Sequence, residues 1–211
     1  MKRIGVLIAV LFIALEARPD ELSEVTKGIQ STYEKVRDLK ARFVQKVTYK
    51  TIGRMQKDEG TVKFKKPDKM KWEYISGQLV ISDGKRIWFY MPDEKRVMTA
   101  DLKTAFSTQT PSNFLSGMGK LTEDFNISIK SSQKGMVCLN LDPKTSIENL
   151  KELVICVDRK DFLVRTSTVV DNLGNETEIE FKEIEMNRGI DDREFEFKIP
   201  QGVEVIETPK R

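Results

Sequence analysis

The sequence of 211 residues contains no histidine. Histidine is the commonest general base and the commonest metal ligand near neutral pH, so its absence removes the usual centre of acid–base catalysis and of zinc binding. The two cysteines are too few for a structural zinc site. No glycine-rich phosphate loop and no Gly-x-Ser-x-Gly motif occur either. We therefore expect no catalytic, metal or cofactor site.

Long hydrophobic runs are scarce, and the one that exists lies at the N-terminus. Two basic residues precede an apolar run over residues 4–15, and Ala17 provides a small residue for cleavage. The run is too short to cross a bilayer and is typical of a secretory signal peptide, although a buried N-terminal helix is the alternative. We therefore predict that residues 1–17 are removed and that residues 18–211 form a single soluble domain in an exported, oxidising compartment.

Neither sign of charge is in marked excess. The 36 Lys and Arg residues and 33 Asp and Glu residues give a formal net charge of +3, which falls to +2 once Lys2, Arg3 and Glu16 are removed. Both signs are interspersed, which is typical of a solvated surface and indicates neither a nucleic-acid nor a membrane partner. About 190 residues are enough for one domain with a sizeable core. We expect a monomer.

The hydrophobic pattern predicts one main helix followed by a long run of strands. Apolar residues recur every three or four positions from Leu22 to Leu39, with Asp20 available as an N-cap, so this helix should lay one face on a sheet. Asp83-Gly84 is a strong signal for a tight hairpin. Alternation predicts about eleven strands, over 40–49, 58–66, 69–75, 78–83, 85–91, 95–99, 125–131, 136–142, 151–158, 162–171 and 176–186.

Two segments depart from this alternation. Residues 101–124 contain short helical pieces broken by proline and glycine, and a connection of this length in a compact domain is usually functional or disordered. Its apolar side chains, among them Phe106, Phe114 and Leu115, argue against disorder and indicate a lid or plug over the sheet. A short closing element follows at 195–206. A meander this long must curl on itself to bury one face.

The segment 60–92 carries most of the information about function. Val62, Phe64, Met70 and Trp72 alternate with polar residues, so one face of an antiparallel sheet is apolar. Large, flexible or aromatic side chains form this face instead of compact Val and Leu. Lys66 shares the parity of Val62 and Phe64, which places a charge at the rim. Such a face either packs into the protein's own core or holds a foreign apolar ligand.

Several short motifs together indicate a known family. They are Phe43-Val44-Gln45-Lys46, Lys65-Lys66-Pro67, Trp72, Val80-Ile81-Ser82-Asp83-Gly84-Lys85, Trp88-Phe89-Tyr90-Met91-Pro92, Phe195-Glu196-Phe197 and Pro200-Gln201-Gly202-Val203. With these motifs the chain resembles the periplasmic carriers of outer-membrane lipoproteins, the LolA family, over nearly the whole predicted domain. It departs from the family at Lys66, where arginine is frequent, and at Met70, where an aromatic residue is frequent.

The resemblance implies a mainly β fold with some helix (α+β). It consists of an incomplete antiparallel β-barrel, an N-terminal helix and a short helical lid over an apolar cavity. The implied function is that of a periplasmic chaperone, without enzymatic activity or cofactor, which binds the acyl chains of outer-membrane lipoproteins. Such a carrier takes its cargo from an ABC-type complex in the inner membrane and passes it to an outer-membrane receptor. Each exposed methylene of a triacylated protein costs about 0.8 kcal/mol in water, so the cargo needs a cover.

The predicted cavity lining combines strand residues with apolar residues of the lid. For each of them the alternative is an ordinary core position, and Met70 suits both roles because its thioether is flexible. The candidates are Phe43, Val62, Phe64, Met70, Trp72, Val80, Phe89, Phe106, Phe114 and Leu115.

Three other functions are open from the sequence alone. An outer-membrane receptor of the same fold would need a lipidated N-terminal cysteine, whereas the first cysteine here is Cys138. A general binding module for free lipid or hydrophobic peptide would use the same cavity. A purely structural sheet would keep its helices in place and bind nothing.

Lys66 is the candidate latch of the lid. In the family, the arginine at this position is expected to donate hydrogen bonds to lid carbonyls and so hold the empty cavity closed. An ammonium group lacks the planar fork of a guanidinium, so Lys66 should be a weaker latch and the lid should open more readily. The alternative is a solvated rim lysine with no such role.

The two cysteines fall in neighbouring predicted strands. If the strands over 136–142 and 151–157 pair with Leu141 opposite Leu153, then Cys138 lies opposite Cys156, on the face away from these leucines. An oxidising compartment would permit a cross-strand disulfide, but only some ladder positions fit disulfide geometry. Two free thiols on the sheet surface are the alternative.

Overall fold

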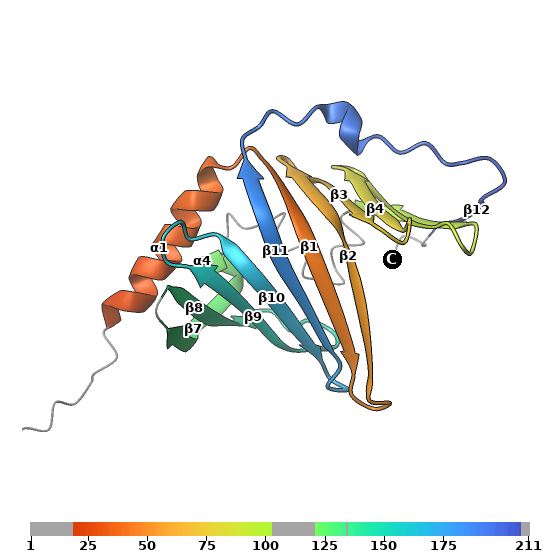
Figure 1. The fold of residues 1–211 in the computed structure, drawn as a ribbon. Helices are drawn as coiled ribbons and strands as arrows, with labels where there is room; N and C mark the ends of the chain where they lie inside the picture. Colours follow the sequence, from red (N-terminus) through yellow and green to blue (C-terminus); the bar gives the residue numbers. More distant parts are fainter. Residues whose placement is uncertain (1–18, 103–120, 134, 208–211) are drawn as a thin grey trace, which may run out of the picture.

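The computed structural model describes residues 19–102, 121–133 and 135–207. Within these ranges the chain forms an N-terminal helix, twelve strands, one further helical turn and one 3-10 turn (Figure 1). In chain order they are α1 (Pro19–Lys35), β1 (Asp38–Tyr49), β2 (Arg54–Lys65), β3 (Lys69–Tyr74), β4 (Leu79–Asp83), β5 (Arg86–Met91), β6 (Arg96–Asp101), α4 (Leu121–Asp124), β7 (Phe125–Gln133), β8 (Met136–Pro143), β9 (Leu150–Asp158), β10 (Val164–Asp171), β11 (Glu176–Met186), η2 (Asp192–Phe195) and β12 (Glu204–Glu207).

All twelve strands belong to one curled sheet that stays open. Their order is β12-β6-β5-β4-β3-β2-β1-β11-β10-β9-β8-β7, so β12 and β7 are edges and do not pair with each other. Neighbouring strands run antiparallel except β12, which runs parallel to β6. Among the described residues, no helix has the length and apolar character needed to cross a membrane.

The eleven strands predicted from alternation are all present, and the departures lie at element ends. The helix ends at Lys35, and Leu39, which continues the helical spacing, belongs instead to β1. The helix begins at Pro19, so Asp20 lies inside its first turn and is not the N-cap. Strand β2 begins four residues before the predicted start, and the closing element contains a twelfth strand. The predicted lid falls largely in residues 103–120, outside the described residues.

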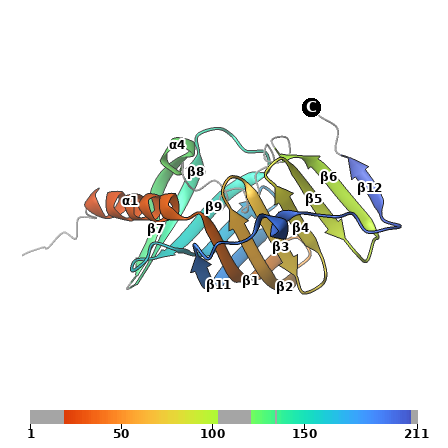
Figure 2. The same ribbon diagram turned by 90° about the horizontal axis from the view of Figure 1, so that it is seen from above.

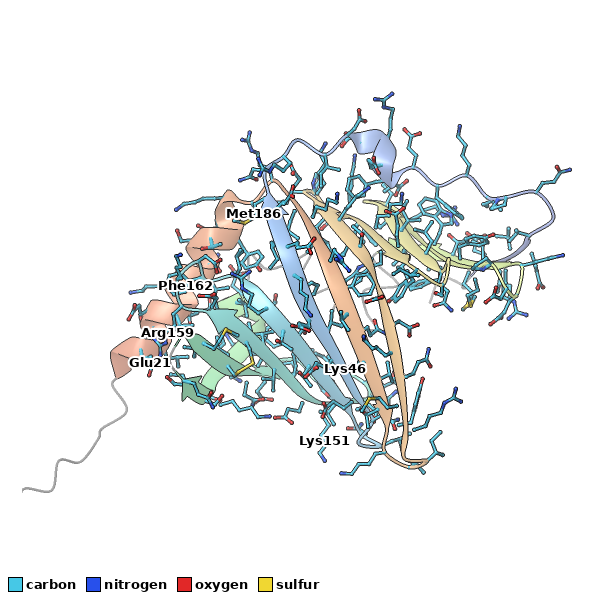
Figure 3. The ribbon with its side chains drawn as sticks, in the orientation of Figure 1. Glu21, Lys46, Lys151, Arg159, Phe162 and Met186 are labelled. Carbon is cyan, nitrogen blue, oxygen red and sulfur yellow. A yellow bond between two sulfur atoms is a disulfide. The ribbon has the colours of Figure 1, made fainter. Side chains whose placement is uncertain are left out.

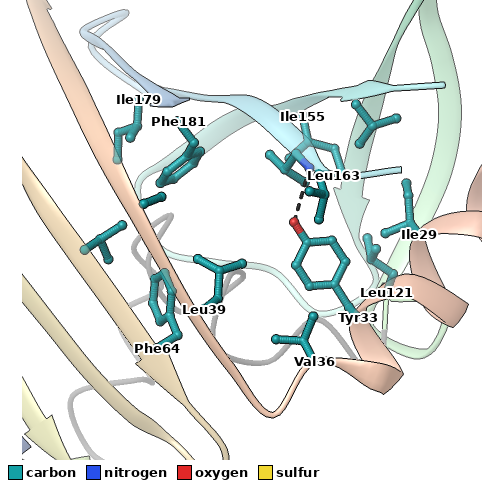
Figure 4. Close-up of a cluster of buried hydrophobic side chains, with 14 of the residues drawn as sticks. Ile29, Tyr33, Val36, Leu39, Phe64, Leu121, Ile155, Leu163, Ile179 and Phe181 are labelled. Atoms are coloured by element: carbon teal, nitrogen blue, oxygen red, sulfur yellow. Dashed lines mark hydrogen bonds between the residues drawn. The ribbon is translucent and has the colours of Figure 1, made fainter. Parts of the chain in front are cut away.

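Helix α1 covers part of the inner face of the sheet, which we define as the face that carries Phe43, Trp72 and Ile155. Ile29 is fully buried and Tyr33 nearly so, in a cluster that includes Ile155. The Val164 backbone N–H donates a hydrogen bond to the Tyr33 hydroxyl over 3.1 Å (Figure 4). Burial raises the pKa of Tyr33 to about 12. The helix therefore packs as a fixed part of the core.

The segment after β11 crosses the opposite, outer face and ends in β12 (Figures 1 and 2). Phe195 in η2 is 1% exposed. The ring centroid of Phe197 lies 6.0 Å from that of Trp88 and 5.9 Å from that of Tyr90. We call residues 187–203 the outer strap, because they cover outward-facing side chains of the sheet such as the fully buried Ile81.

Charge also holds the outer strap on the sheet. Like charges directly opposite each other destabilise a strand pair. Strands β2 and β3 nevertheless place four lysines on the outer face in two facing pairs, Lys63 with Lys71 and Lys65 with Lys69. Glu194 lies 2.6 Å from the Lys63 ammonium. Asp192 lies 2.6 Å from Lys65 and 3.1 Å from Lys69. Glu73 of β3 lies 2.8 Å from Lys71 and 3.6 Å from Lys63, so this residue and the acids of the strap together neutralise the repulsion among the lysines.

A first prediction concerns the contact between α1 and the β9–β10 turn. A Cβ atom at Gly28 would lie 2.5 Å from the Phe162 ring. Gly28→Ala should therefore lower the free energy of unfolding by about 1–3 kcal/mol through overpacking, despite the gain of about 1 kcal/mol in helix propensity. Urea unfolding measures this change. In a Phe162→Ala background the same substitution should become stabilising, and stabilisation in the wild-type background would contradict the packing argument.

A second prediction concerns acid and the outer strap. Hydrogen bonds from Lys65 and from Lys63 lower the pKa of Asp192 and of Glu194, respectively, below their usual values. A carboxyl with a lowered folded pKa contributes stability above its unfolded pKa and loses it as pH falls through the folded value. Asp192→Asn/Glu194→Gln should therefore be less stable than the wild type near neutral pH and equally stable in strong acid. A difference in urea unfolding that persists in strong acid would contradict this.

Candidate functional site

A cavity of about 280 Å³ opens on the inner face between the two halves of the curled sheet. Strands β3, β4 and β5 form one wall, and β1, β10 and β11 form the rest. The lining side chains are Gln45, Met70, Trp72, Tyr74, Val80, Ile87, Phe89, Val169, Thr177 and Ile179. None of them carries a charge at neutral pH. The cavity can therefore hold hydrocarbon, and its described lining offers no carboxylate, imidazole or thiol for catalysis.

The strand register explains why residues far apart in the sequence share this face. Val62 faces Trp72 across β2 and β3, and Trp72 faces Val80 across β3 and β4. Val80 in turn faces Phe89 across β4 and β5. Directly opposite residues point to the same side of a sheet. One apolar row therefore crosses four strands on the inner face.

Aromatic rings stiffen the middle of this row. The Trp72 ring lies edge-on to Phe43, with centroids 4.8 Å apart, and to Phe64, with centroids 5.8 Å apart. Tyr74 packs on the same Phe43 ring at 5.0 Å. The Tyr74 hydroxyl donates to Gln45 Oε1 over 3.1 Å, and burial raises the pKa of Tyr74 to about 12. The Tyr74 hydroxyl thus has a hydrogen-bond partner, and the phenol stays neutral at physiological pH.

The predicted lining residues fall into four groups. Four lie together on the cavity: Met70, Trp72, Val80 and Phe89. Phe43 and Val62 are 1% and 0% exposed and pack in the core beside it. Phe64 lines a second, smaller pocket between the C-terminal end of α1 and the sheet. Three lie outside the described residues: Phe106, Phe114 and Leu115.

The sequence did not indicate the far wall of the cavity. Val169, Thr177 and Ile179 reach it because β11 pairs with β1 and β10 pairs with β11. Alternation within β10 and β11 shows which of their residues share a face. It does not show that β11 pairs with β1, because these two strands are separated by more than half of the chain. The other unpredicted lining residues are Gln45, Tyr74 and Ile87.

Lys66 joins the end of β2 to the end of α1. Its Nζ lies 2.7 Å from the carbonyl oxygen of Tyr33 and 3.4 Å from that of Glu34. The last carbonyls of a helix lack intrahelical partners, and a positive charge is favourable there. The same Lys66 lines the second pocket together with Phe64 and Tyr33. The lid carbonyls that the resemblance implies as its partners belong to residues outside the described ranges.

Cys138 and Cys156 form a disulfide between β8 and β9, with their sulfur atoms 2.08 Å apart. The two residues lie directly opposite each other, in the predicted register. Their neighbours Leu139 and Ile155 are fully buried on the inner face, so the disulfide lies on the outer face. It joins two strands that contribute no side chain to the cavity.

The sequence matches the family described as outer membrane lipoprotein carrier protein LolA over residues 34–198. This match begins in the last turn of α1 and extends past β11 into the outer strap. It therefore includes Lys66, the disulfide and every side chain that lines the cavity.

Individual proteins give the same result. The chain is 31% identical to the outer-membrane lipoprotein carrier protein of Azotobacter vinelandii, over 97% of this chain and 98% of the relative. It is 32% identical to the protein of that name from Pseudomonas aeruginosa, over 95% of this chain and 99% of the relative. A solved structure of an uncharacterized conserved protein from Thermus thermophilus superimposes with a TM-score of 0.55 at 10% identity. That similarity covers 89% of this chain and 99% of the other, and it concerns the fold alone.

Proposed function

We propose that this chain, which belongs to the LolA family of outer membrane lipoprotein carrier proteins, is a periplasmic chaperone that carries lipoproteins by their acyl chains. It would receive them from an ABC-type complex of the inner membrane and deliver them to a receptor in the outer membrane. The proposal includes export, with residues 1–17 acting as the signal peptide. The observation that carries it is the uncharged, largely apolar cavity on the inner face of an open sheet.

Burial of hydrocarbon supplies the required affinity. Each buried methylene contributes about 0.8 kcal/mol, so ten methylenes would supply on the order of 8 kcal/mol of favourable free energy, part of which offsets the entropy lost on association. Aromatic rings and the flexible Met70 offer such a surface without a charged group that would have to be desolvated. Hydrophobic contacts are non-directional, so binding does not depend on the amino-acid sequence of the cargo protein. This suits a carrier whose cargo proteins share only their acyl chains.

The direct test is recovery of endogenous lipoprotein with the purified protein. Phe89 lines the cavity and is 36% exposed, so Phe89→Asp can place a carboxylate there without unfolding the core. Loss of apolar contact and desolvation of the new charge should lower the amount of bound lipoprotein by roughly tenfold or more. Ile199→Asp is the matched control, because Ile199 is 46% exposed and lies in the outer strap.

The outcomes separate the proposed function from its alternatives. Recovery of acylated lipoprotein that depends on Phe89 and not on Ile199 supports a carrier. Recovery of free lipid or hydrophobic peptide alone would indicate a general binding module. A protein that binds neither would be a structural sheet, and the proposal would then be wrong.

The latch role of Lys66 belongs to the same proposal. Lys66 Nζ is held at the end of α1 by its bonds to the Tyr33 and Glu34 carbonyls, and in this proposal it also bonds carbonyls of the lid, so that opening of the lid breaks those bonds. A closed state stabilised in this way lowers the net affinity for cargo and so favours its release to the receptor. The single ammonium makes a weaker tie than the guanidinium frequent in the family.

Two substitutions test the latch. Lys66→Leu removes the bonds, so cargo uptake should be kept or strengthened while transfer to the receptor slows. Lys66→Arg should stabilise the closed state and weaken uptake. Both rates are measured with purified acylated lipoprotein, and Lys198→Leu in the outer strap is the control. Transfer by Lys66→Leu at the unaltered rate would show that the latch is not at this residue.

A further inference from the structure

Two turns that are far apart in the sequence lie side by side at one end of the molecule (Figure 1). One is the tip of the β1–β2 hairpin, and the other is the turn between β10 and β11. The Lys50 backbone N–H donates to Asn175 Oδ1 over 3.2 Å, and the Lys50 side chain lies against Gly174. We call the exposed side chains of this end the tip patch; they are Lys50, Ile52, Arg54, Met55, Lys57 and Leu173.

The tip patch exposes large apolar side chains. Among the described residues, Leu173 is 75% exposed, Ile52 68% and Met55 65%. These are three of the four most exposed large apolar side chains in the described part of the chain. Single exposed apolar residues need no explanation, but several gathered at one projecting end indicate a contact surface.

The same patch carries cations that no acid neutralises. Residues 49–57 contain Lys50, Arg54 and Lys57 and no acidic residue. All three are exposed, and within the described ranges none of them forms an ion pair. Farther along β1 the pattern differs, since Lys46 pairs with Glu178 at 3.1 Å and Arg42 pairs with Glu183 at 3.3 Å. The excess of positive charge is therefore local to the tip.

Nearby acids do not cancel this charge. The Asp171 carboxylate is occupied inside its own turn, where it accepts hydrogen bonds from the backbone N–H groups of Leu173 and Asn175. Glu176 is exposed beside the patch, opposite Thr48, and within the described ranges it forms no ion pair with Lys50, Arg54 or Lys57. Lys151 adds a further exposed cation at the same end of the molecule (Figure 3). The surface that results combines exposed hydrocarbon with unpaired positive charge.

We propose that the tip patch is a docking surface for anionic phospholipid bilayers. Apolar side chains at the tip would enter the interface while the lysines and the arginine meet lipid phosphates. Each Lys or Arg near an anionic surface strengthens partitioning by about fivefold. Apolar anchors or basic residues alone give marginal binding, and the two together give binding that is measurable yet reversible. This charge complementarity identifies an anionic lipid surface as the occupant.

The position of the patch relates it to the cavity. Val47 pairs with Thr177, a lining residue, and Gln45 also lines the cavity. From Gln45 to Ile52 the hairpin covers seven residues, or roughly 20 Å at the rise of a strand. Docking of the tip would therefore bring the cavity close to the bilayer surface. The proposal goes beyond the carrier function and does not require bound lipoprotein.

The experiment compares two variants of equal charge change on the chain without residues 1–17, which precede the described fold. Ile52→Asp/Arg54→Glu alters the tip patch. Ile199→Asp/Lys198→Glu makes the same two kinds of change at exposed residues of the outer strap. Co-sedimentation is measured with vesicles of phosphatidylglycerol and phosphatidylethanolamine and with vesicles of phosphatidylcholine. Thermal unfolding verifies that both variants are folded.

The wild type should sediment with the anionic vesicles and only weakly with phosphatidylcholine. The tip variant should lose at least tenfold in partitioning, and the strap variant should match the wild type. Added salt should weaken the binding, because exposed charges are screened. The proposal is overturned if the wild type ignores anionic vesicles, which would leave the patch to a protein partner. Equal weakening of both variants would overturn it too, since net charge and not the tip would then control binding.

Discussion

The structure depends on one constraint: a single sheet must curl to bury an apolar inner face that its own helix covers only in part. Strand order brings β3, β4 and β5 to one side and β10 and β11 to the other. Helix α1 fills the space against β9 and β10 with Ile29 and Tyr33. Beyond the helix, the described part of the chain leaves the space between the two walls unfilled, and this space is the cavity. The cavity therefore results from the curl of the sheet and not from a separate binding element.

The junction of α1, β1 and β11 is held together by hydrogen bonds. Asp38 is 5% exposed, and its carboxylate accepts hydrogen bonds from the backbone N–H groups of Arg188 and Gly189 at 2.8 and 3.1 Å. Asn187 bonds back in two ways: its N–H donates to the Asp38 carbonyl, and its side-chain oxygen accepts from the Arg37 N–H. Inner helix and outer strap thus leave the sheet from one hydrogen-bonded corner. A disturbance of this corner would affect both faces of the sheet together.

Local patterns predicted the strands and four of the ten side chains that line the cavity. Alternation placed Met70, Trp72 and Val80 on one face, and Asp83-Gly84 makes its turn with Asp83 accepting from the N–H groups of Lys85 and Arg86. The spacing of apolar residues gave a wrong prediction at Leu39. This residue fits the helical repeat of α1 but belongs to β1. The spacing also failed for the parallel β12 and for the far wall at Thr177, because pairing over long sequence distances decides them. No periodicity within a strand encodes its partner.

The distribution of charge on the surface likewise cannot be predicted from local sequence. The overall balance is close to neutral and indicates no membrane partner, yet the fold separates charges that the sequence intersperses. Four facing lysines on β2 and β3 find acids in the outer strap, whereas the cations of the tip find none in the described chain. The strap supplies its acids because Phe195 and Phe197 anchor it to the sheet. No segment crosses the hairpin tip in the described structure, so its charge stays available to an external anion. Unpaired charge at a surface therefore follows from the path of the chain, and composition alone does not report it.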